Sequence, residues 1–229
     1  AIDLAREMPD VATQQQVAEF YCELAAGEIM RSRPDSARGY LASAMEQNRK
    51  CVRASLLQGD LLLQEGNLSG AIDAWQRIEQ QDPTYLALVA QRLLETYRKM
   101  SRRDEGTALL RGYLERYPSL DLLDVVYQQI LEAEGNEAAY RLVRDELARN
   151  PTLLGLEKLM SARLPLAAPE IRPDVELAKT IIQGYTKRLS RYRCDNCGFK
   201  ARQFYWRCPA CGGWESYPPR RSEEFDQTL

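Results

Sequence analysis

Small and large apolar residues recur along this chain at intervals of about 34 residues. The clearest copy spans residues 52–85, and its marked positions are Gly59, Leu62, Gly66, Ala71, Trp75, Ile78 and Pro83. Small residues such as Gly59 and Ala71 let two antiparallel helices approach closely, and Trp75 is expected to fill the layer between one helix pair and the next. Pro83 should end the second helix because proline lacks the amide donor that a helix interior needs. The pattern predicts a helix–turn–helix unit.

The same register continues on both sides of this copy. A shift of 34 residues backwards defines a repeat at 18–51 through Ala25, Ala37, Leu41 and Ala44. Forward shifts reach Leu94, Tyr97, Gly106, Leu110, Tyr113 and Pro118, and then Tyr127, Ile130, Ala139, Val143 and Pro151. The offsets are those of the tetratricopeptide repeat, although Gly106 replaces the small alanine and Tyr127 the glycine. We therefore predict an all-α tetratricopeptide repeat (TPR) solenoid with four repeats in residues 18–151.

The register also extends to the start of the chain. We predict that residues 1–17 form the second helix of a truncated repeat, with Ala1, Ala5 and Met8 at its small and large positions. We expect the chain to be a fragment of a longer protein, with further repeats upstream and a membrane segment as one candidate for what precedes them. No run of 18 apolar residues and no signal peptide is found in the sequence itself.

Residues 152–190 are expected to cap the solenoid. Leu153, Leu156, Met160 and Leu164 recur at helical spacing, and the three prolines of residues 165–173 then forbid a helix. A last helix should run from Asp174 to about Ser190. Its predicted packing face consists of Val175, Ala178, Ile182, Tyr185 and Leu189.

Four cysteines near the C-terminus predict a metal site in a small module at residues 191–219. Cys194, Cys197, Cys208 and Cys211 form two C-x-x-C pairs ten residues apart, a spacing at which four thiolates close a tetrahedral site. The glycine after each pair can take the left-handed conformation that turns backbone amides towards the sulfurs. Two disulfides or a redox-active C-x-x-C are the alternatives. Residues 199–206 should supply short strands between the pairs, and residues 220–229 form a tail.

A module of this size cannot build an adequate core, so metal binding should supply most of its folding free energy. Its aromatic residues exceed what such a core needs; they are Phe199, Phe204, Trp206 and Trp214. Some of them are expected to face the repeats, and a platform for stacking nucleobases is the alternative. Only three residues separate the last helix from Cys194, so we expect the module to dock at a fixed angle and to melt together with the repeats.

Composition limits the function classes. The chain has 229 residues, 45% of them hydrophobic, which allows one or two domains with a sizeable core. A net charge of -2 disfavours a chain that binds nucleic acid over its whole surface. The sequence contains no histidine, the usual proton shuttle and catalytic zinc ligand, which disfavours hydrolytic chemistry. With no catalytic constellation in the sequence, we predict no enzyme and no catalytic residues. Cys22 and Cys51 should be small core residues, as suits a reducing cytosol.

Residues 187–221 contain nine basic residues and only two acidic ones, Asp195 and Glu215, which is an excess of seven positive charges. The nine are Lys187, Arg188, Arg191, Arg193, Lys200, Arg202, Arg207, Arg220 and Arg221. Part of the excess would neutralise a cluster of four thiolates around a divalent ion. A solvated surface is the simplest interpretation, and an acidic protein, anionic lipid headgroups or RNA are the others.

Five features point to one family: degenerate repeats, a cap broken by prolines, the motifs YRCDNCGF and FYWRCPACGGW, the basic tail, and FYCELA in the first full repeat. With these features the chain resembles the lipopolysaccharide assembly protein B family. The resemblance covers essentially the whole chain. It implies an N-terminal membrane anchor that this chain would lack, repeats on the cytoplasmic face of the bacterial inner membrane, and a rubredoxin-like metal module. The metal ligands it implies are Cys194, Cys197, Cys208 and Cys211.

The resemblance also implies an adaptor that restrains lipopolysaccharide synthesis by presenting the lipid A pathway deacetylase LpxC to the membrane protease FtsH. Other inner-membrane regulators or assembly proteins of lipopolysaccharide would be further partners. Rubredoxins separate their two cysteine pairs by many more residues than the ten found here. One structural zinc ion is therefore favoured, and iron is the alternative.

First-helix positions of TPR repeats line a concave groove, and these positions are the candidate partner-binding residues. They are Arg53, Asp60, Gln64, Gln91, Glu95, Arg98, Asp121, Asp124 and Gln128. Their mixed charge suits an internal segment or a folded surface rather than a C-terminal carboxylate; solvated positions without a ligand are the simpler interpretation. Two other functions stay open: a repeat scaffold with a nucleic-acid-binding ribbon, which requires a steep salt dependence, and a rubredoxin-like redox carrier, which requires iron.

Overall fold

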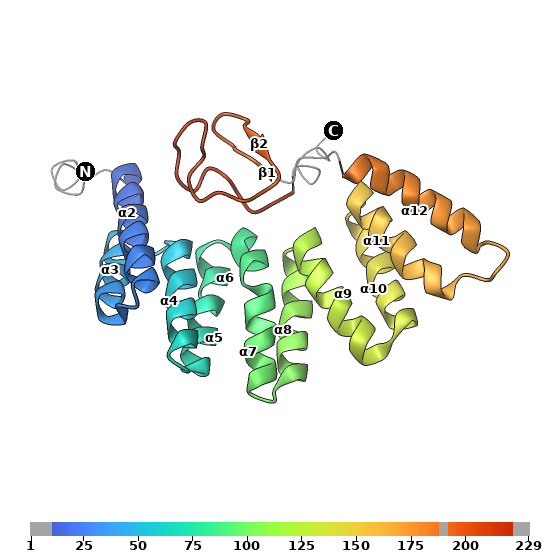
Figure 1. Cartoon of the computed structure of the whole chain (residues 1–229), viewed down its shortest axis with the longest axis horizontal. Helices are drawn as coiled ribbons and strands as arrows, with labels where there is room; N and C mark the ends of the chain where they lie inside the picture. Colours follow the sequence, from blue (N-terminus) through green and yellow to red (C-terminus); the bar gives the residue numbers. More distant parts are fainter. Residues whose placement is uncertain (1–10, 188–191, 222–229) are drawn as a thin grey trace. The chain divides into compact units, whose positions relative to one another are not determined.

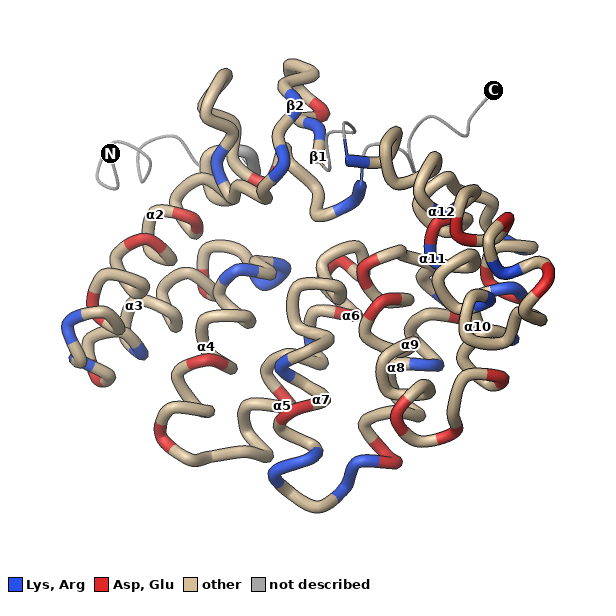
Figure 2. Tube along the Cα trace, turned by 45° about the vertical axis from the view of Figure 1, so that its right-hand side comes forward, with Lys and Arg blue, Asp and Glu red and all other residues tan. Residues whose placement is uncertain are grey.

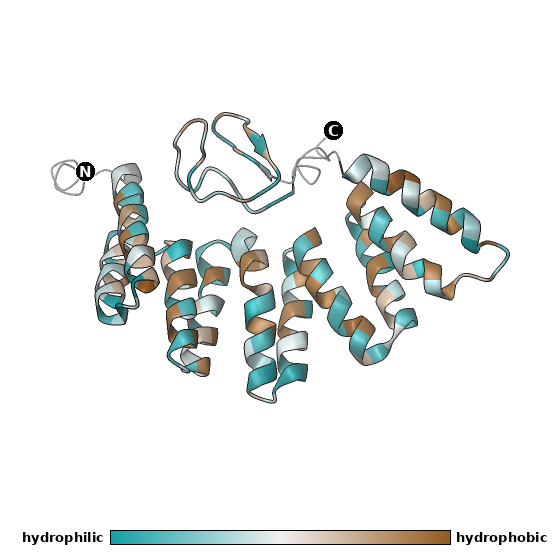
Figure 3. Cartoon of the chain, viewed as in Figure 1, coloured by the Kyte–Doolittle hydropathy of each residue, from teal (hydrophilic) through white to brown (hydrophobic). Residues whose placement is uncertain are grey.

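The computed structural model describes residues 11–187 and 192–221, and most of these residues are helical (Figure 1). Residues 1–10 of the predicted second helix, with Ala1, Ala5 and Met8, lie outside the described residues. The predicted end of that helix is wrong, because residues 11–17 are the start of the long helix that continues to Met30. Two compact units make up the chain, Ala1–Arg103 and Asp104–Leu229. In both units, residues of opposite charge are interspersed along the helices (Figure 2), and hydrophobic and hydrophilic residues alternate at helical spacing (Figure 3).

The first unit consists of helix pairs that follow the predicted repeats. Its elements are α2 (Val11–Met30), α3 (Pro34–Gln47), α4 (Val52–Gln64), α5 (Leu68–Gln76), α6 (Ile78–Gln81), the 3-10 turn η1 (Pro83–Leu88) and α7 (Ala90–Lys99). Helix α2 packs on α3, and α4 packs on α5. The turn between α4 and α5 contains Gly66 with a φ of 79°, and the side chain of Asn67 accepts a hydrogen bond from the amide of Gly70 to cap α5.

The second unit continues the pattern and adds the cap and the cysteine module. Its elements are α8 (Arg103–Arg116), α9 (Leu120–Glu134), α10 (Asn136–Arg149), α11 (Leu153–Arg163), the 3-10 turn η2 (Leu164–Leu166), α12 (Arg172–Thr186), β1 (Tyr192–Arg193) and β2 (Lys200–Ala201). Helix α9 packs on α10, α10 on α11 and α11 on α12. The predicted all-α TPR architecture with a small C-terminal β module is confirmed.

Gly59 and Trp75 show why the repeat needs its small residue. Trp75 is fully buried, and its Nε1 donates to the carbonyl of Leu56 at 3.2 Å. A Cβ added at Gly59 would lie 2.2 Å from this Nε1. Trp75 therefore fills the space left by Gly59 within its own repeat. From the sequence, it was expected to fill the layer between one repeat and the next.

We expect Gly59→Ala to destabilise the first unit by about 2–3 kcal/mol, because the buried indole has no room to retreat from the new methyl group. Gly39→Ala in α3 is the matched control, since an added Cβ there meets nothing within 4 Å. That variant should stabilise the unit by about 0.5–1 kcal/mol through helix propensity alone. Denaturant unfolding of the two variants checks the difference, and equal stabilities would contradict the packing argument.

The packing face of α12 differs from the predicted one. Val175, Ala178 and Ile182 are half-buried as predicted, but Tyr185 is 66% exposed. The next packing position is Thr186, which is buried and donates to Glu157 of α11 at 2.8 Å. The predicted face followed a strict heptad spacing, which selects Tyr185. A straight helix repeats every 3.6 residues, so its buried face shifts by one position to Thr186. The predicted face residue Leu189 lies outside the described residues.

The strand prediction for residues 199–206 was also too long. Only Lys200–Ala201 forms a strand, antiparallel to Tyr192–Arg193, with Tyr192 opposite Ala201 and Arg193 opposite Lys200. The aromatic residues that follow serve packing within the module, as described below. In residues 11–187 and 192–221, no helix combines the length and apolar character needed to cross a bilayer.

Candidate metal centre

Two equivalent turns present the four cysteines. In the first, the amide of Gly198 donates to the carbonyl of Cys194 at 2.8 Å; in the second, the amide of Gly212 donates to that of Cys208 at 2.9 Å. Gly198 and Gly212 have φ values of 74° and 73°, the left-handed region that glycine adopts without strain. The β1–β2 pair closes the first turn, and a bridge between Arg207 and Trp214 closes the second. The predicted left-handed conformation of both glycines is confirmed.

The four sulfur atoms fit a tetrahedral metal ion. The Sγ atoms of Cys194 and Cys211 are 3.8 Å apart, those of Cys197 and Cys208 are 3.7 Å apart, and all four lie within 4.8 Å of one another. Metal–sulfur bonds of about 2.3 Å in a regular tetrahedron separate the sulfurs by about 3.8 Å. All four cysteines are free thiols. The arrangement therefore supports one structural metal ion rather than two disulfides.

Hydrogen bonds prepare the buried ligand for metal binding. Burial opposes ionisation of Cys194, but the hydroxyl of Ser216 at 3.4 Å and the amides of Cys197 and Asn196 outweigh it and lower the pKa of this thiol to about 6. At Cys197, the amide of Phe199 favours the thiolate, yet burial and the three neighbouring cysteines raise the pKa to about 12. The Cys194 thiolate forms readily, whereas the Cys197 thiolate needs a cation to offset the effect of its neighbours.

Aromatic side chains complete the small core beside the sulfurs. Tyr217 is fully buried next to Cys194 and Cys208, and its hydroxyl donates to the carbonyl of Tyr192 at 3.2 Å. Phe204 packs against this cluster. Two other predicted surplus aromatics also have neighbours in the module, since Trp206 meets Phe204 edge to face at 5.0 Å and Arg207 lies 5.5 Å above Trp214. Phe199 is 37% exposed.

Arg221 links the end of the module to the repeats. Its side chain is only 14% exposed, its Nε donates to Asp121 at 2.9 Å, and its guanidinium also reaches Asp124 at 3.2 Å. Lys158 of α11 binds the other oxygen of Asp124 at 2.7 Å. Asp121 and Asp124 of α9, two of the predicted partner-binding positions, therefore hold cations of this same chain.

Arg53 is the second predicted groove residue that the structure places differently. It is 7% exposed, and its guanidinium binds Glu19 at 3.1 Å and Glu23 at 2.7 Å, both on α2 of the preceding repeat. The first turn of α4 packs against α2, so a residue at this position is covered by its neighbour. Arg53 is therefore buried in ion pairs between two neighbouring repeats.

The remaining candidate positions are half-buried or exposed. Asp60 is half-buried and pairs with Arg92 at 3.1 Å, while Gln91 donates to Glu95 at 2.7 Å on the surface of α7. The exposed candidates are Gln64, Gln91, Glu95, Arg98 and Gln128. These five residues are the exposed members of the predicted set, and their part in partner binding stays a prediction.

Cys22 and Cys51 are confirmed as core residues. Both are fully buried, and their Sγ atoms are 3.6 Å apart. The contact with Cys51, together with burial, raises the pKa of Cys22, so this thiol stays protonated. Glu19 lies beside Cys51, but its carboxylate is already paired with Arg53.

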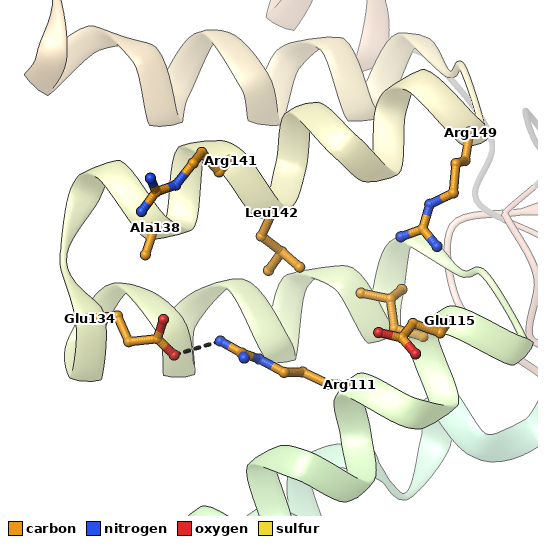
Figure 4. Close-up of a pocket in the computed structure, with 8 residues that line it drawn as sticks. Arg111, Glu115, Glu134, Ala138, Arg141, Leu142 and Arg149 are labelled. Carbon is orange, nitrogen blue, oxygen red and sulfur yellow. Dashed lines mark hydrogen bonds and ion pairs between the residues drawn. The ribbon is translucent and has the colours of Figure 1, made fainter.

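A pocket of about 250 Å³ between α8, α9 and α10 was not predicted (Figure 4). Its lining is Arg111, Leu114, Glu115, Glu134, Ala138, Arg141, Leu142 and Arg149. Arg111 and Glu134 form an ion pair at 2.5 Å across one end. No local motif marks the pocket, since its lining comes from three helices.

Fold and site together define a helical repeat protein of the TPR class with a C-terminal four-cysteine ribbon. Residues 192–218 match the family described as "Rubredoxin metal binding domain". Lipopolysaccharide assembly protein B of Escherichia coli strain K12 is 27% identical over 226 residues, which are 96% of this chain and 58% of that protein. The protein of the same name from Haemophilus influenzae is 26% identical over 235 residues, 99% of this chain and 58% of that protein. The resemblance drawn from the sequence is confirmed.

This chain thus spans 58% of the length of these curated relatives. Two solved structures are also similar. The Pseudomonas aeruginosa pilF structure has a TM-score of 0.47 and 14% identity, covering 75% of this chain and 77% of that one. TTC0263, a TPR protein of Thermus thermophilus, has a TM-score of 0.43 and 16% identity, covering 75% of this chain and 92% of that one.

Proposed function

We propose that this chain is the repeat-and-ribbon part of an adaptor that regulates lipopolysaccharide assembly by binding proteins, and that it is not an enzyme. The observation that carries the proposal is the similarity to proteins named lipopolysaccharide assembly protein B over 96% of the chain, including the four-cysteine ribbon. Helical repeats of this class commonly offer extended surfaces to protein partners. The exposed polar positions on α4, α7 and α9 are candidates for that contact.

The metal in this proposal is structural, with zinc favoured. Cys194, Cys197, Cys208 and Cys211 would hold it, and it would supply charge neutralisation and a cross-link between the two turns. Four protein sulfurs fill a tetrahedral zinc site, so it has no open position for a water or a substrate. Ser216 and the backbone amides orient the sulfurs, and Tyr217 keeps the site dry from one side.

In the finer form of the proposal, the partners are the deacetylase LpxC and the membrane protease FtsH, at the cytoplasmic face of the inner membrane. An N-terminal anchor outside this chain would hold the adaptor at the membrane. An adaptor of this kind contributes effective concentration and orientation, and a short tether yields local concentrations in about the millimolar range. The ribbon and the repeats must then keep a set geometry, because each would hold one partner.

The test is the lifetime of LpxC in cells that carry variants of the full-length, anchored protein at matched levels. Cys211→Ser should lengthen that lifetime several-fold by removing a metal ligand, and Arg98→Glu should do so by weakening capture on the exposed face of α7. Lys50→Glu is the control, because it reverses an exposed charge between α3 and α4.

An unchanged LpxC lifetime in both the cysteine and the Arg98 variants would overturn the adaptor mechanism. The nucleic-acid interpretation of the basic ribbon would then be the next to test, through the salt dependence of RNA binding. Lengthening by all three variants, control included, would indicate a general loss of folding.

A further inference from the structure

A second cluster of metal-ligating side chains lies where α2 meets the start of α4. In residues 11–187 and 192–221, two groups bring at least three such side chains together with all their ligand atoms within 4.8 Å of one another. One is the four-cysteine site of the ribbon. The other consists of Glu19, Cys22 and Cys51, and all three side chains are fully buried. The proposed function uses none of these three.

The ligand atoms of this cluster are spaced as a tetrahedral metal ion requires. The Sγ atoms of Cys22 and Cys51 are 3.6 Å apart, and Sγ of Cys51 lies 3.7 Å from Oε1 of Glu19. Zinc bonds of about 2.3 Å to sulfur and 2.0–2.2 Å to oxygen give separations of about 3.8 Å and 3.5–3.7 Å. Glu19 and Cys22 are three residues apart on α2 and therefore share one face of that helix.

The charges around the cluster balance when a divalent ion is bound. Two thiolates and the carboxylate of Glu19 carry three negative charges, and a divalent ion with the guanidinium of Arg53 supplies three positive ones. Arg53 binds Oε2 of Glu19 at 3.1 Å, whereas Oε1 accepts from the thiol of Cys51. Glu23, which also binds Arg53, is 53% exposed, so water screens its charge. A buried cluster without net charge avoids the cost of burying an isolated ion.

The start of α4 also favours a thiolate at Cys51. Cys51 is the N-cap residue of this 13-residue helix, and its side chain makes no capping hydrogen bond. Amide groups in the first turn of a helix carry a partial positive charge, which stabilises a nearby thiolate. Both cysteines are free thiols, so binding of one divalent ion releases one proton from each of them.

We propose that Glu19, Cys22 and Cys51 form a second metal site, which takes one zinc ion and ties α2 to the start of α4. Two thiolates and one carboxylate suit this ion, and the fourth position of the tetrahedron is left to water. Three protein ligands hold an ion less tightly than the four sulfurs of the ribbon. The second ion therefore exchanges with the solution, and desalting leaves only the ribbon ion. When bound, it clamps the first two repeats together.

Equilibrium dialysis of the folded, reduced full chain against excess zinc, followed by elemental analysis, tests the proposal. The unsubstituted chain should hold two zinc ions at saturation and one after desalting. Cys22→Ala and Cys51→Ala should each hold only the ribbon ion, because alanine removes a ligand but keeps a small apolar side chain in the core. The control is Ala25→Ser in the same buried cluster, which should still hold two ions.

Cobalt(II) in place of zinc identifies the ligands. Its thiolate charge-transfer absorption grows with the number of bound thiolates. Loss of the second site leaves four of the six cysteines bound, so the absorption should fall by about a third in Cys22→Ala. A single zinc ion per unsubstituted chain at saturation would overturn the proposal. So would a second ion that persists in both cysteine variants, or a cobalt spectrum that neither variant changes.

Discussion

Replacing Cys208 with serine is expected to unfold the ribbon at residues 192–218 and release its metal. Cys208 is 1% exposed, is one of the four ligands and, with Cys194 and Tyr217, makes up the buried cluster of the module. Structural zinc contributes about 10–16 kcal/mol to the folding of comparable small modules, so the remaining aromatic contacts cannot compensate. Elemental analysis should fall from one zinc per chain to none, and near-ultraviolet circular dichroism from the ribbon aromatics should collapse.

Two results would contradict this prediction. A Cys208→Ser variant that keeps both its zinc and its aromatic signal would show that the cysteines do not hold the ribbon together. A stoichiometric iron centre with a reversible one-electron couple, in protein isolated from its native host, would instead favour the redox carrier.

Loss of the ribbon should also loosen α9, since Arg221 follows the module directly and binds Asp121 and Asp124. The matched comparison is Arg221→Ala, which removes these contacts but leaves every metal ligand in place. Hydrogen exchange of α9 should accelerate in both variants, while zinc is lost only from Cys208→Ser. Unchanged exchange of α9 in both would show that ribbon and repeats fold independently, against the docking expected from the short linker.

The second large effect is expected at Arg53. Replacing it with methionine leaves Glu19, whose side chain is 1% exposed, as a buried charge without its partner. Breaking such a pair destabilises a protein by about 3–5 kcal/mol, so the first unit should unfold at a distinctly lower denaturant concentration. Adding Glu19→Gln to the same chain should recover part of the loss, because the uncompensated charge is then gone.

The control for Arg53 is Arg38→Met, which removes an exposed guanidinium paired with Asp35 and Glu65. Exposed pairs contribute little, so this variant should unfold close to the original chain. Equal midpoints for the Arg53 and Arg38 variants would contradict the buried pair. If the Arg53 variant loses stability as expected, charge reversal at Arg53 cannot be used to measure partner capture. Variants at the exposed Arg98 and Gln128 can be used instead.

The repeat register and the metal ligands could be predicted from the sequence because both depend on short spacings along the chain. A helix turns every 3.6 residues, so small and large residues at fixed offsets, such as Gly59 and Trp75, already specify which faces meet. The two C-x-x-C pairs likewise place each couple of sulfurs within one turn, whatever surrounds them. Cys22 and Cys51 belong to the same group, since their positions on the repeat pattern are those of buried residues.

Contacts between distant parts of the chain were decided by the tertiary structure. Arg221 lies 100 residues from Asp121, and no local pattern links them. Arg53 looked like a groove position because the repeat geometry assigns it there, yet α2 of the preceding repeat supplies two carboxylates that draw it into the interface. Tyr185 turned outwards because the neighbour α11 meets Thr186 instead. A spacing rule describes one helix, whereas burial of a charge or a ring depends on the side chains that a second helix brings to it.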